Sequence, residues 1–205
     1  MPNDSTTDGY HHGDLRNALL SAAEGLLVQH GPGGLSLREV ARVTGVSHTA
    51  PYRHFRGKAA LLQALARRGF ERLHAAMTDA AANVPHGPEQ QLIAAGIAYV
   101  QLAVNHAEIT QLMFGGTLDP AADAAGDTPG RDAFAALQTI IESGIQAGVF
   151  RQRASRELAL VAWTSMHGLA MLMTAGLLEV DTDNPAALDQ LVGSVASNVI
   201  YGIAR

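Results

Sequence analysis

The sequence predicts an all-α protein, with a small amino-terminal helical unit joined by one long helix to a larger carboxy-terminal helical unit. Apolar residues recur at helical spacing along almost the whole chain. No segment alternates apolar and polar residues over a run bounded by turn residues, as a half-buried strand would. Segments rich in glycine and proline, at 31–34, 85–88 and 115–130, divide the pattern into blocks of helical length. We therefore expect no sheet.

The first two helices have start and stop signals in the sequence. The first should run from about Asp14 to His30 and end at the glycine-rich segment that follows. Ser36 and Glu39 have the spacing of a capping box, which opens a short second helix. Gly45 supplies the residue that favours the end of that helix.

The remaining elements follow from the same periodicity. Ser47 should cap a third helix, from His48 to about Phe55. Longer helices are expected at about Lys58–Asn83, Glu89–Asn105, Ala107–Phe114, Arg131–Ala147, Ser155–Ala175 and Pro185–Ile203, with a loop at 115–130. The predicted organisation is a disordered tail at 1–12, a first domain at 13–57, a connecting helix at 58–83 and a carboxy-terminal domain at 84–205.

Composition restricts the compartment and the chemistry. The 205 residues can bury a substantial core without disulfide bonds or a structural metal, and none of them is cysteine. Disulfides and zinc sites built on thiolates are therefore excluded, which is typical of a reducing compartment. Residues 1–10 are polar and lack the apolar stretch of a secretory signal. We expect a cytoplasmic protein.

Charge is distributed unevenly along the chain, whose net charge is −5. Residues 10–70 have a net charge of +5, whereas residues 71–205 have a net charge of −8. A basic front and an acidic rear suggest that contact with a polyanion is confined to the front. Uneven surface charge without a function would look the same, so charge alone does not decide.

One segment is long enough to cross a bilayer. Leu158–Leu178 contains no Asp, Glu, Lys or Arg over its 21 residues. Its threonine, serine, histidine and glycine residues dilute the hydrophobicity, and it would be a lone span among amphipathic helices. A helix that packs in the subunit core on one face and against a partner subunit on the other has the same composition. We favour the buried helix, and so no membrane partner.

Residues 35–62 carry the strongest functional signal. Two short helices joined at 45–47 form a helix-turn-helix pattern, in which Ala41 lets the helices approach and Gly45 allows the turn. A structural helical hairpin could look similar. The third helix separates the two interpretations, because Ser-His-Thr-Ala-Pro-Tyr-Arg-His-Phe at 47–55 has a polar, aromatic and basic face. Base edges need donors and acceptors and phosphates need cations, so this face predicts a helix that enters a major groove of DNA.

These residues resemble the TetR-type (TetR/AcrR) family of transcriptional repressors. The resemblance rests on Leu-Ser-Leu-Arg-Glu-Val-Ala at 35–41, Gly-Val-Ser at 45–47, Tyr-Arg-His-Phe at 52–55, and Lys58 before two leucines. It covers about the first third of the chain. Further on, residues 163–170 resemble the Trp-His-Gly signature of one branch of the family. The resemblance implies a homodimer whose recognition helices read two half-sites of a DNA operator, and a carboxy-terminal domain that binds a small-molecule effector.

Individual residues can be carried over only in the DNA-binding part. The family contacts bases from the positions of Arg38, His48, Thr49 and Tyr52, and it contacts phosphates from the positions of Ser47, Arg53, His54 and Lys58.

Pro51 departs from the family pattern, which has Leu or Ile there. A proline in the first turn removes a backbone donor and disfavours helical geometry at the preceding residue. The base contacts of His48 and Thr49 depend on that geometry.

Several of these residues have a purely structural alternative. Ser47 could act only as a cap, Tyr52 could belong to the core, and Arg53, His54 and Lys58 could be solvated surface. His167 is more often a hydrogen-bonded core histidine than a ligand-binding one, and Trp163 is expected to be packing.

The candidate effector pocket rests on residue type, because pockets are lined mainly by apolar and aromatic groups with a few polar ones. The same residues at helical spacing are more often plain core. The candidates are Tyr99, Met113, Phe114, Phe134, Leu137, Ile141, Trp163, Met166 and His167.

An enzyme is the competing class. No two of the nine histidines are three or four residues apart, and no phosphate loop, nucleophile elbow or dinucleotide fingerprint is present. We therefore expect no metal, no cofactor and no catalytic residue. The function predicted is a DNA-binding repressor released by a small molecule. The alternative is a DNA-binding regulator whose rear domain binds a protein partner or has no effector.

Overall fold

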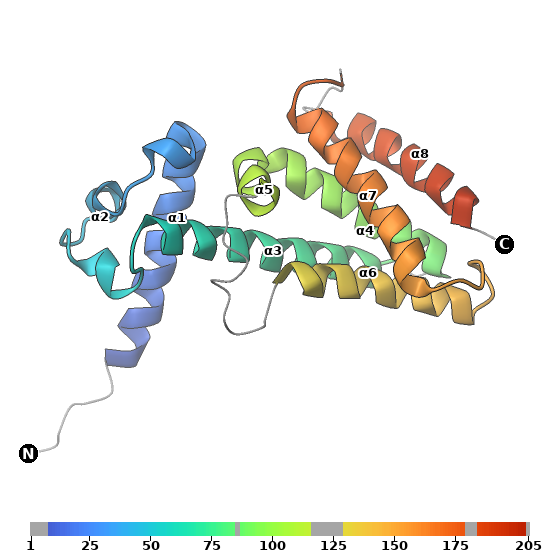
Figure 1. The fold of residues 1–205 in the computed structure, drawn as a ribbon, viewed down its shortest axis with the longest axis horizontal. Coiled ribbons are helices and arrows are strands. Elements are labelled where there is room, and N and C mark those ends of the chain that lie inside the picture. Colours follow the sequence, from blue (N-terminus) through green and yellow to red (C-terminus); the bar gives the residue numbers. More distant parts are fainter. Residues whose placement is uncertain (1–7, 85–86, 116–128, 179–183, 204–205) are drawn as a thin grey trace, which may run out of the picture. The chain divides into compact units, whose positions relative to one another are not determined.

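The structure is a computed structural model that describes residues 8–84, 87–115, 129–178 and 184–203. Over these residues the chain forms eight α-helices and one short 3₁₀ helix and contains no strand, which confirms the all-α prediction (Figure 1). The elements are α1 Asp8–Gly34, α2 Leu37–Thr44, η1 Ala50–Arg53, α3 Lys58–Ala82, α4 Gly87–Asn105, α5 Ala107–Phe114, α6 Pro129–Gln146, α7 Ser155–Thr174 and α8 Pro185–Ile203.

The chain divides into two compact units. The first comprises residues 1–68 and 108–120, and the second comprises residues 69–107 and 121–205. The division falls within α3, so this helix contributes to both cores. Leu61 and Leu65 are buried in the first unit, whereas Leu73 and Met77 are buried in the second.

The helix α1 differs from its predicted bounds at both ends. It begins at Asp8 instead of Asp14, so the predicted tail is helical from Asp8 onward, and residues 1–7 lie outside the described residues. No proline interrupts residues 8–14, and extending a helix costs less than starting one. The predicted stop is present as a break at Gly31, where φ 65° and ψ 179° are not helical. The chain then makes one more turn to Gly34.

The first unit has its core between α1, α2 and the beginning of α3. The periodic leucines and alanines of α1 are buried, and Val40 and Ala41 of α2 pack against them. Phe55, which is 3% exposed, lies beneath the Arg16 guanidinium at 5.5 Å from its ring centroid. Arg68 of α3 donates a hydrogen bond to Ser21 of α1 over 3.2 Å.

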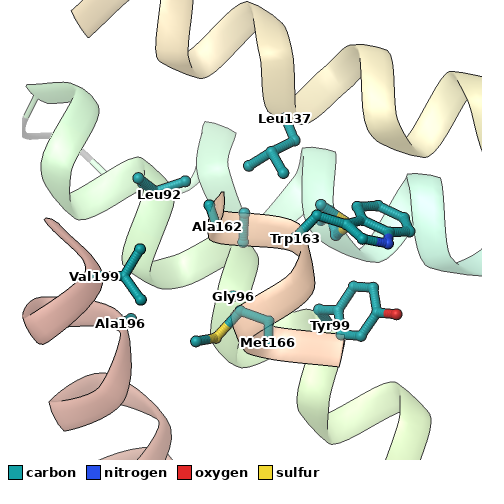
Figure 2. A pocket seen from close by; sticks show the side chains of 11 residues that line it. Leu92, Gly96, Tyr99, Leu137, Ala162, Trp163, Met166, Ala196 and Val199 are labelled. Atoms are coloured by element: carbon teal, nitrogen blue, oxygen red, sulfur yellow. The ribbon is translucent and has the colours of Figure 1, made fainter. Parts of the chain in front are cut away.

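In the second unit α4 is the central helix. It packs against α6, α7 and α8, and α7 also packs against both α6 and α8. These helices and α3 surround a small cavity, with Trp163 and Tyr99 at one end and Leu92 and Val199 at the other (Figure 2).

The helices α4 to α8 lie within two residues of their predicted bounds. The ends of α6 and α7 show why the sequence predicts them well. After α6 and α7 the chain turns at Gly148 (φ 72°) and Gly176 (φ 68°), the left-handed conformation that glycine adopts readily. In each turn the N–H groups of the glycine and of the residue after it donate hydrogen bonds to carbonyls in the last turn of the helix. Most of the predicted loop at 115–130 lies outside the described residues, and α6 already begins at Pro129.

The hypothesis of a membrane span at Leu158–Leu178 can be compared with the helices themselves. In the described part of the chain, no single helix is both long and apolar enough to cross a bilayer. Only α4 and α5 taken together reach that length and composition, and they are bent by 104° at their junction.

Candidate nucleic-acid interface and buried cavity

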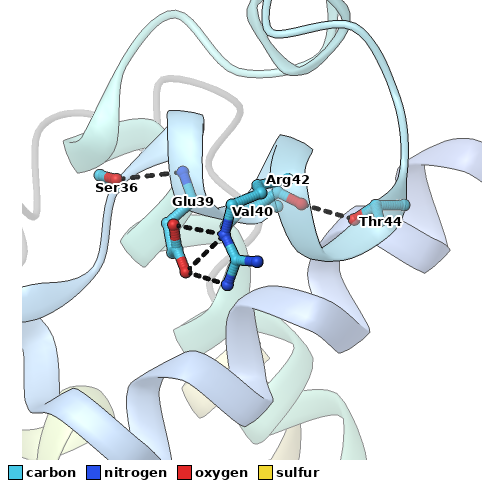
Figure 3. A network of polar contacts seen from close by, with 5 residues as sticks. All are labelled: Ser36, Glu39, Val40, Arg42 and Thr44. Carbon is cyan, nitrogen blue, oxygen red and sulfur yellow. Dashed lines mark hydrogen bonds and ion pairs between the residues drawn. The ribbon is translucent and has the colours of Figure 1, made fainter.

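The second helix of the predicted helix-turn-helix begins and ends as its sequence predicts. The Ser36 hydroxyl accepts a hydrogen bond from the Glu39 backbone N–H over 3.2 Å (Figure 3). Gly45 has φ 74° and ψ 23°, and the N–H groups of Gly45 and Val46 close the end of α2 on the Arg42 and Ala41 carbonyls. This glycine makes the turn that redirects the chain toward residues 47–55, the recognition segment that the sequence predicts.

The capping box is half formed. The Glu39 carboxylate does not return to Ser36 in the described contacts, because it accepts hydrogen bonds from the Arg42 guanidinium, the shortest at 2.6 Å. The hydrogen bond from Arg42 lowers the pKa of the Glu39 carboxyl and raises that of Arg42. Glu39, one of the three acidic residues in the basic stretch 10–70, is therefore paired with Arg42, and the two charges offset each other.

The predicted third helix, His48–Phe55, is shorter and tighter than expected. Regular structure is limited to the 3₁₀ helix η1, Ala50–Arg53, with Pro51 in its first turn. Ser47 is not its cap, since the capping position falls on Thr49 and is made without a side-chain hydrogen bond. Pro51 supplies no N–H and disfavours α-geometry at Ala50, which is the physical reason for the correction.

The residues carried over as base contacts are exposed to solvent. Arg38 lies on α2, His48 and Thr49 lie in the turn before η1, and Tyr52 lies on η1. The Tyr52 side chain is 55% exposed, which argues against the alternative that it belongs to the core. The Thr49 hydroxyl is 3.2 Å from the Ser47 hydroxyl, so the two share a hydrogen bond.

The residues predicted to contact phosphates differ in their exposure and in their contacts. Ser47 and Arg53 are exposed, whereas His54 is half-buried and its ring lies 6.4 Å from the Phe55 ring. The Lys58 ammonium donates a hydrogen bond to the Gly33 carbonyl over 2.8 Å, which ties the start of α3 to the end of α1. Lys58 therefore has a structural role that its sequence position did not predict.

The nine predicted pocket residues do not all come together. Tyr99, Leu137, Trp163 and Met166 line the cavity of the second unit, and Phe134 lines a neighbouring groove. Met113 and Phe114 lie on α5, which falls mainly in the first unit, and Ile141 is fully buried. The prediction missed the other lining residues because most are ordinary small or aliphatic core residues: Met77, Leu92, Ala95, Gly96, Ala162, Ala196 and Val199.

The cavity is small and almost entirely apolar. Its volume is about 20 Å³, room for about one water molecule, whereas pockets for small molecules hold roughly 300–1,000 Å³. Two methionines, Met77 and Met166, border it, and a methyl group placed on Gly96 would lie 3.1 Å from the Met166 sulfur. Methionine side chains are flexible, so this wall can be repacked at small cost.

Tyr99, which lines the cavity beside Trp163, forms a polar pair with His167. The Tyr99 hydroxyl and His167 Nδ1 are 2.8 Å apart, and Tyr99 is 2% exposed. Burial raises the pKa of the Tyr99 hydroxyl and lowers the pKa of His167 below its ordinary value of 6.5. Both groups are therefore neutral near pH 7, and one donates to the other according to the histidine tautomer. This agrees with the structural alternative for His167.

The arrangement defines a class of protein. A helix-turn-helix followed by an exposed aromatic and basic recognition segment is typical of DNA-binding proteins. Among the described residues, no three His, Asp or Glu side chains form a group that could hold a metal ion.

Comparisons with known proteins identify the family. The profile described as bacterial regulatory proteins, tetR family, matches residues 19–65, and that of the tetracyclin repressor-like C-terminal domain matches residues 92–195. The chain belongs to the TetR family of transcription regulators and is not an enzyme. A search of curated proteins found no match.

Solved structures resemble the chain over nearly its whole length. A protein of unknown function from Rhodococcus sp. RHA1 is 37% identical, with a TM-score of 0.82 over 97% of this chain and 100% of that one. The TetR family regulator PfmR from Thermus thermophilus is 20% identical, with a TM-score of 0.67 over 91% and 99%. A tetR family protein from Rhodococcus RHA1 is 21% identical, with a TM-score of 0.69 over 92% and 96%. The last two show the shared fold alone.

The Tyr99–His167 pair gives a prediction about pH. Because burial lowers the pKa of His167 in the folded protein, the unfolded chain binds more protons there at and below pH 6.5, so the free energy of unfolding falls as the pH drops from 6.5 to the lowered pKa. His167→Asn keeps an acceptor for the tyrosine hydroxyl and has no titration. Denaturant unfolding of both proteins between pH 8 and pH 5 should give a flatter profile for the variant, and parallel profiles would contradict the assignment.

Proposed function

We propose that the protein is a transcriptional repressor that binds a specific DNA operator as a homodimer and is released by a small-molecule effector. The observation that carries the DNA-binding proposal is the exposed recognition segment, with Tyr52 and Arg53 on η1 and Arg38 on the neighbouring helix. The tyrosine and Arg38 are proposed to contact bases together with His48 and Thr49. A regulator of this kind acts on chromosomal DNA, so we propose a cytoplasmic location.

Base and phosphate contacts should respond differently to substitution. Tyr52→Ala should weaken operator binding by about 1–3 kcal/mol and relax the sequence preference, because a base contact is lost. Arg53→Ala should weaken binding to all duplexes alike and reduce the salt slope by about one, because a phosphate contact is lost. The operator would first be selected from random duplexes and then used in competition titrations at several salt concentrations.

A matched control separates these effects from general loss of charge. Arg131→Ala removes an exposed arginine from α6, in the other unit, and should change neither affinity nor salt slope. If the Tyr52 and Arg53 variants also bound as wild type does, the recognition segment would be wrongly assigned. Lys58→Ala is a poorer test, because it also removes the hydrogen bond to Gly33.

The dimer interface is proposed on the outer faces of α7 and α8, which lie side by side in Figure 1. Val161 and Leu172 of α7 are 47% and 44% exposed, and they lie on one helical stripe with Ser165 and Gly168. The hydroxyls of Thr164 and Ser165 donate to carbonyls of their own helix. This face could therefore be buried against a second copy without leaving those donors unpaired, as a four-helix bundle requires.

A charge in this stripe should separate the subunits. Val161→Glu would place a carboxylate in the proposed interface, where burial of a charge is costly. Light scattering should give a dimer for wild type and a monomer for the variant. Val28→Glu, the same change at an exposed position of α1, should remain dimeric. A wild-type monomer at micromolar concentration would contradict the proposed interface.

The effector is proposed to act through α3. Met77 of this helix lines the cavity, while Leu61 and Leu65 of the same helix belong to the core of the DNA-binding unit. An occupant that displaced Met77 would bias the position of α3. Two recognition segments must lie about 34–36 Å apart to enter successive major grooves, so a shift of a few ångströms reduces DNA affinity.

Linkage makes this proposal measurable. Typical coupling would change operator affinity about 5- to 150-fold, and the operator must change effector affinity by the same factor. A compound library would be screened for release of labelled operator, and each hit titrated with and without unlabelled operator. Hits that bind equally in both conditions would contradict the mechanism. The small volume of the cavity favours the alternative in which the rear unit binds a protein partner, and a screen without hits would support it.

A further inference from the structure

Trp163 stands between two spaces in the second unit. On one side is the buried cavity of about 20 Å³, and on the other is an open groove of about 590 Å³. Among the described residues, Trp163 alone lines both the cavity and the groove. The groove is otherwise lined by Gly130, Phe134, Ala154, Arg156, Glu157 and Leu160.

Two ring contacts hold the indole in place. The Tyr99 ring meets it edge-to-face with centroids 5.2 Å apart and planes at 75°, and the Phe134 ring does so at 5.8 Å and 67°. Such contacts are individually weak, and displacement of the indole would break both of them. Figure 2 shows the indole beside the Tyr99 ring at one end of the cavity.

We propose that Trp163 is a gate, which swings aside to join the groove and the cavity into one ligand site. This inference deepens the proposed effector function and rests on it. The closed cavity is too small for a ligand, whereas the groove already has the volume of a ligand site, and an open gate would add the apolar cavity as its inner end. Met166 lines the cavity with a flexible side chain, so a change of its conformation can enlarge the inner end of the site.

The lining identifies the chemical class of the ligand. The inner cavity has no charged side chain among its lining residues, and its one hydroxyl, on Tyr99, is already paired with His167. A charge buried there would have no partner, so the inner part of the ligand is uncharged. An aromatic ring restores the contacts with Tyr99 and Phe134 that the displaced indole gives up. The ligand is an aromatic molecule whose polar end stays in the groove, beside Arg156 and Glu157.

The chain offers a direct optical test, because Trp163 is its only tryptophan. The probe is 4-bromobenzyl alcohol, whose bromine quenches tryptophan fluorescence on contact, and 4-methylbenzyl alcohol is the matched compound without a quencher. The bromo compound should quench Trp163 to saturation. The methyl compound should make the indole more accessible to acrylamide. Binding of the bromo compound without quenching, or an unchanged acrylamide accessibility, would overturn the gate.

Removal of the gate gives the second test. Trp163→Ala should bind the methyl compound about 5- to 100-fold more tightly than wild type in equilibrium dialysis, the ratio that corresponds to two ring contacts no longer broken on entry. Leu169→Ala shortens another buried side chain of α7 that lines neither space, and its affinity should equal that of wild type. Trp163→Phe, which keeps a smaller ring, should lie between. Equal affinity of all variants, or no binding by Trp163→Ala, would overturn the proposal.

Operator titrations separate this inference from the proposed function. If the compounds displace Trp163 and operator affinity does not change, the gate stands and the effector mechanism fails. If a compound releases the operator while Trp163 fluorescence and accessibility stay constant, the effector mechanism stands and the gate is wrong.

Discussion

The continuity of α3 is the constraint on which the two units depend. The helix runs without a break from Lys58 to Ala82, and its apolar side chains are divided between the two cores. Neither unit can bury its apolar surface without its share of this helix, because a helix is stabilised mainly by the packing of its apolar face. The same helix is therefore part of both cores, as the proposed effector mechanism requires.

The helix α7 shows how one uncharged segment serves several surfaces. One face, with Ala162 and Met166, packs in the core of the second unit, and a second face presents Trp163 toward the groove and His167 toward Tyr99. The third face carries Val161 and its stripe at the surface. Three such faces together cover the circumference of a helix, and burial of the third face in the proposed dimer would account for its lack of charge.

The sequence predicted the existence of nearly every element, because its signals are local. Glycines at 45, 148 and 176 adopt the left-handed conformation at the ends of α2, α6 and α7. The cavity could not be predicted in the same way. Residues such as Ala196 and Val199 have no property that separates a cavity wall from ordinary core, and their position depends on how α8 packs against α4. The aromatic residues Tyr99 and Trp163 could be found from residue type alone.

The recognition segment is where local and global requirements conflict. The family pattern favours a regular helix, whereas Pro51 removes a donor and leaves only the four residues of η1. Pro51 is itself buried, so its ring gains packing in the first unit while the segment loses α-helical hydrogen bonds. A 3₁₀ helix has about three residues per turn instead of about 3.6, which changes the angle between neighbouring side chains. Tyr52 and Arg53 are therefore presented in directions that an α-helix would not give, and base preferences of relatives with Leu or Ile at this position should not be transferred to this chain.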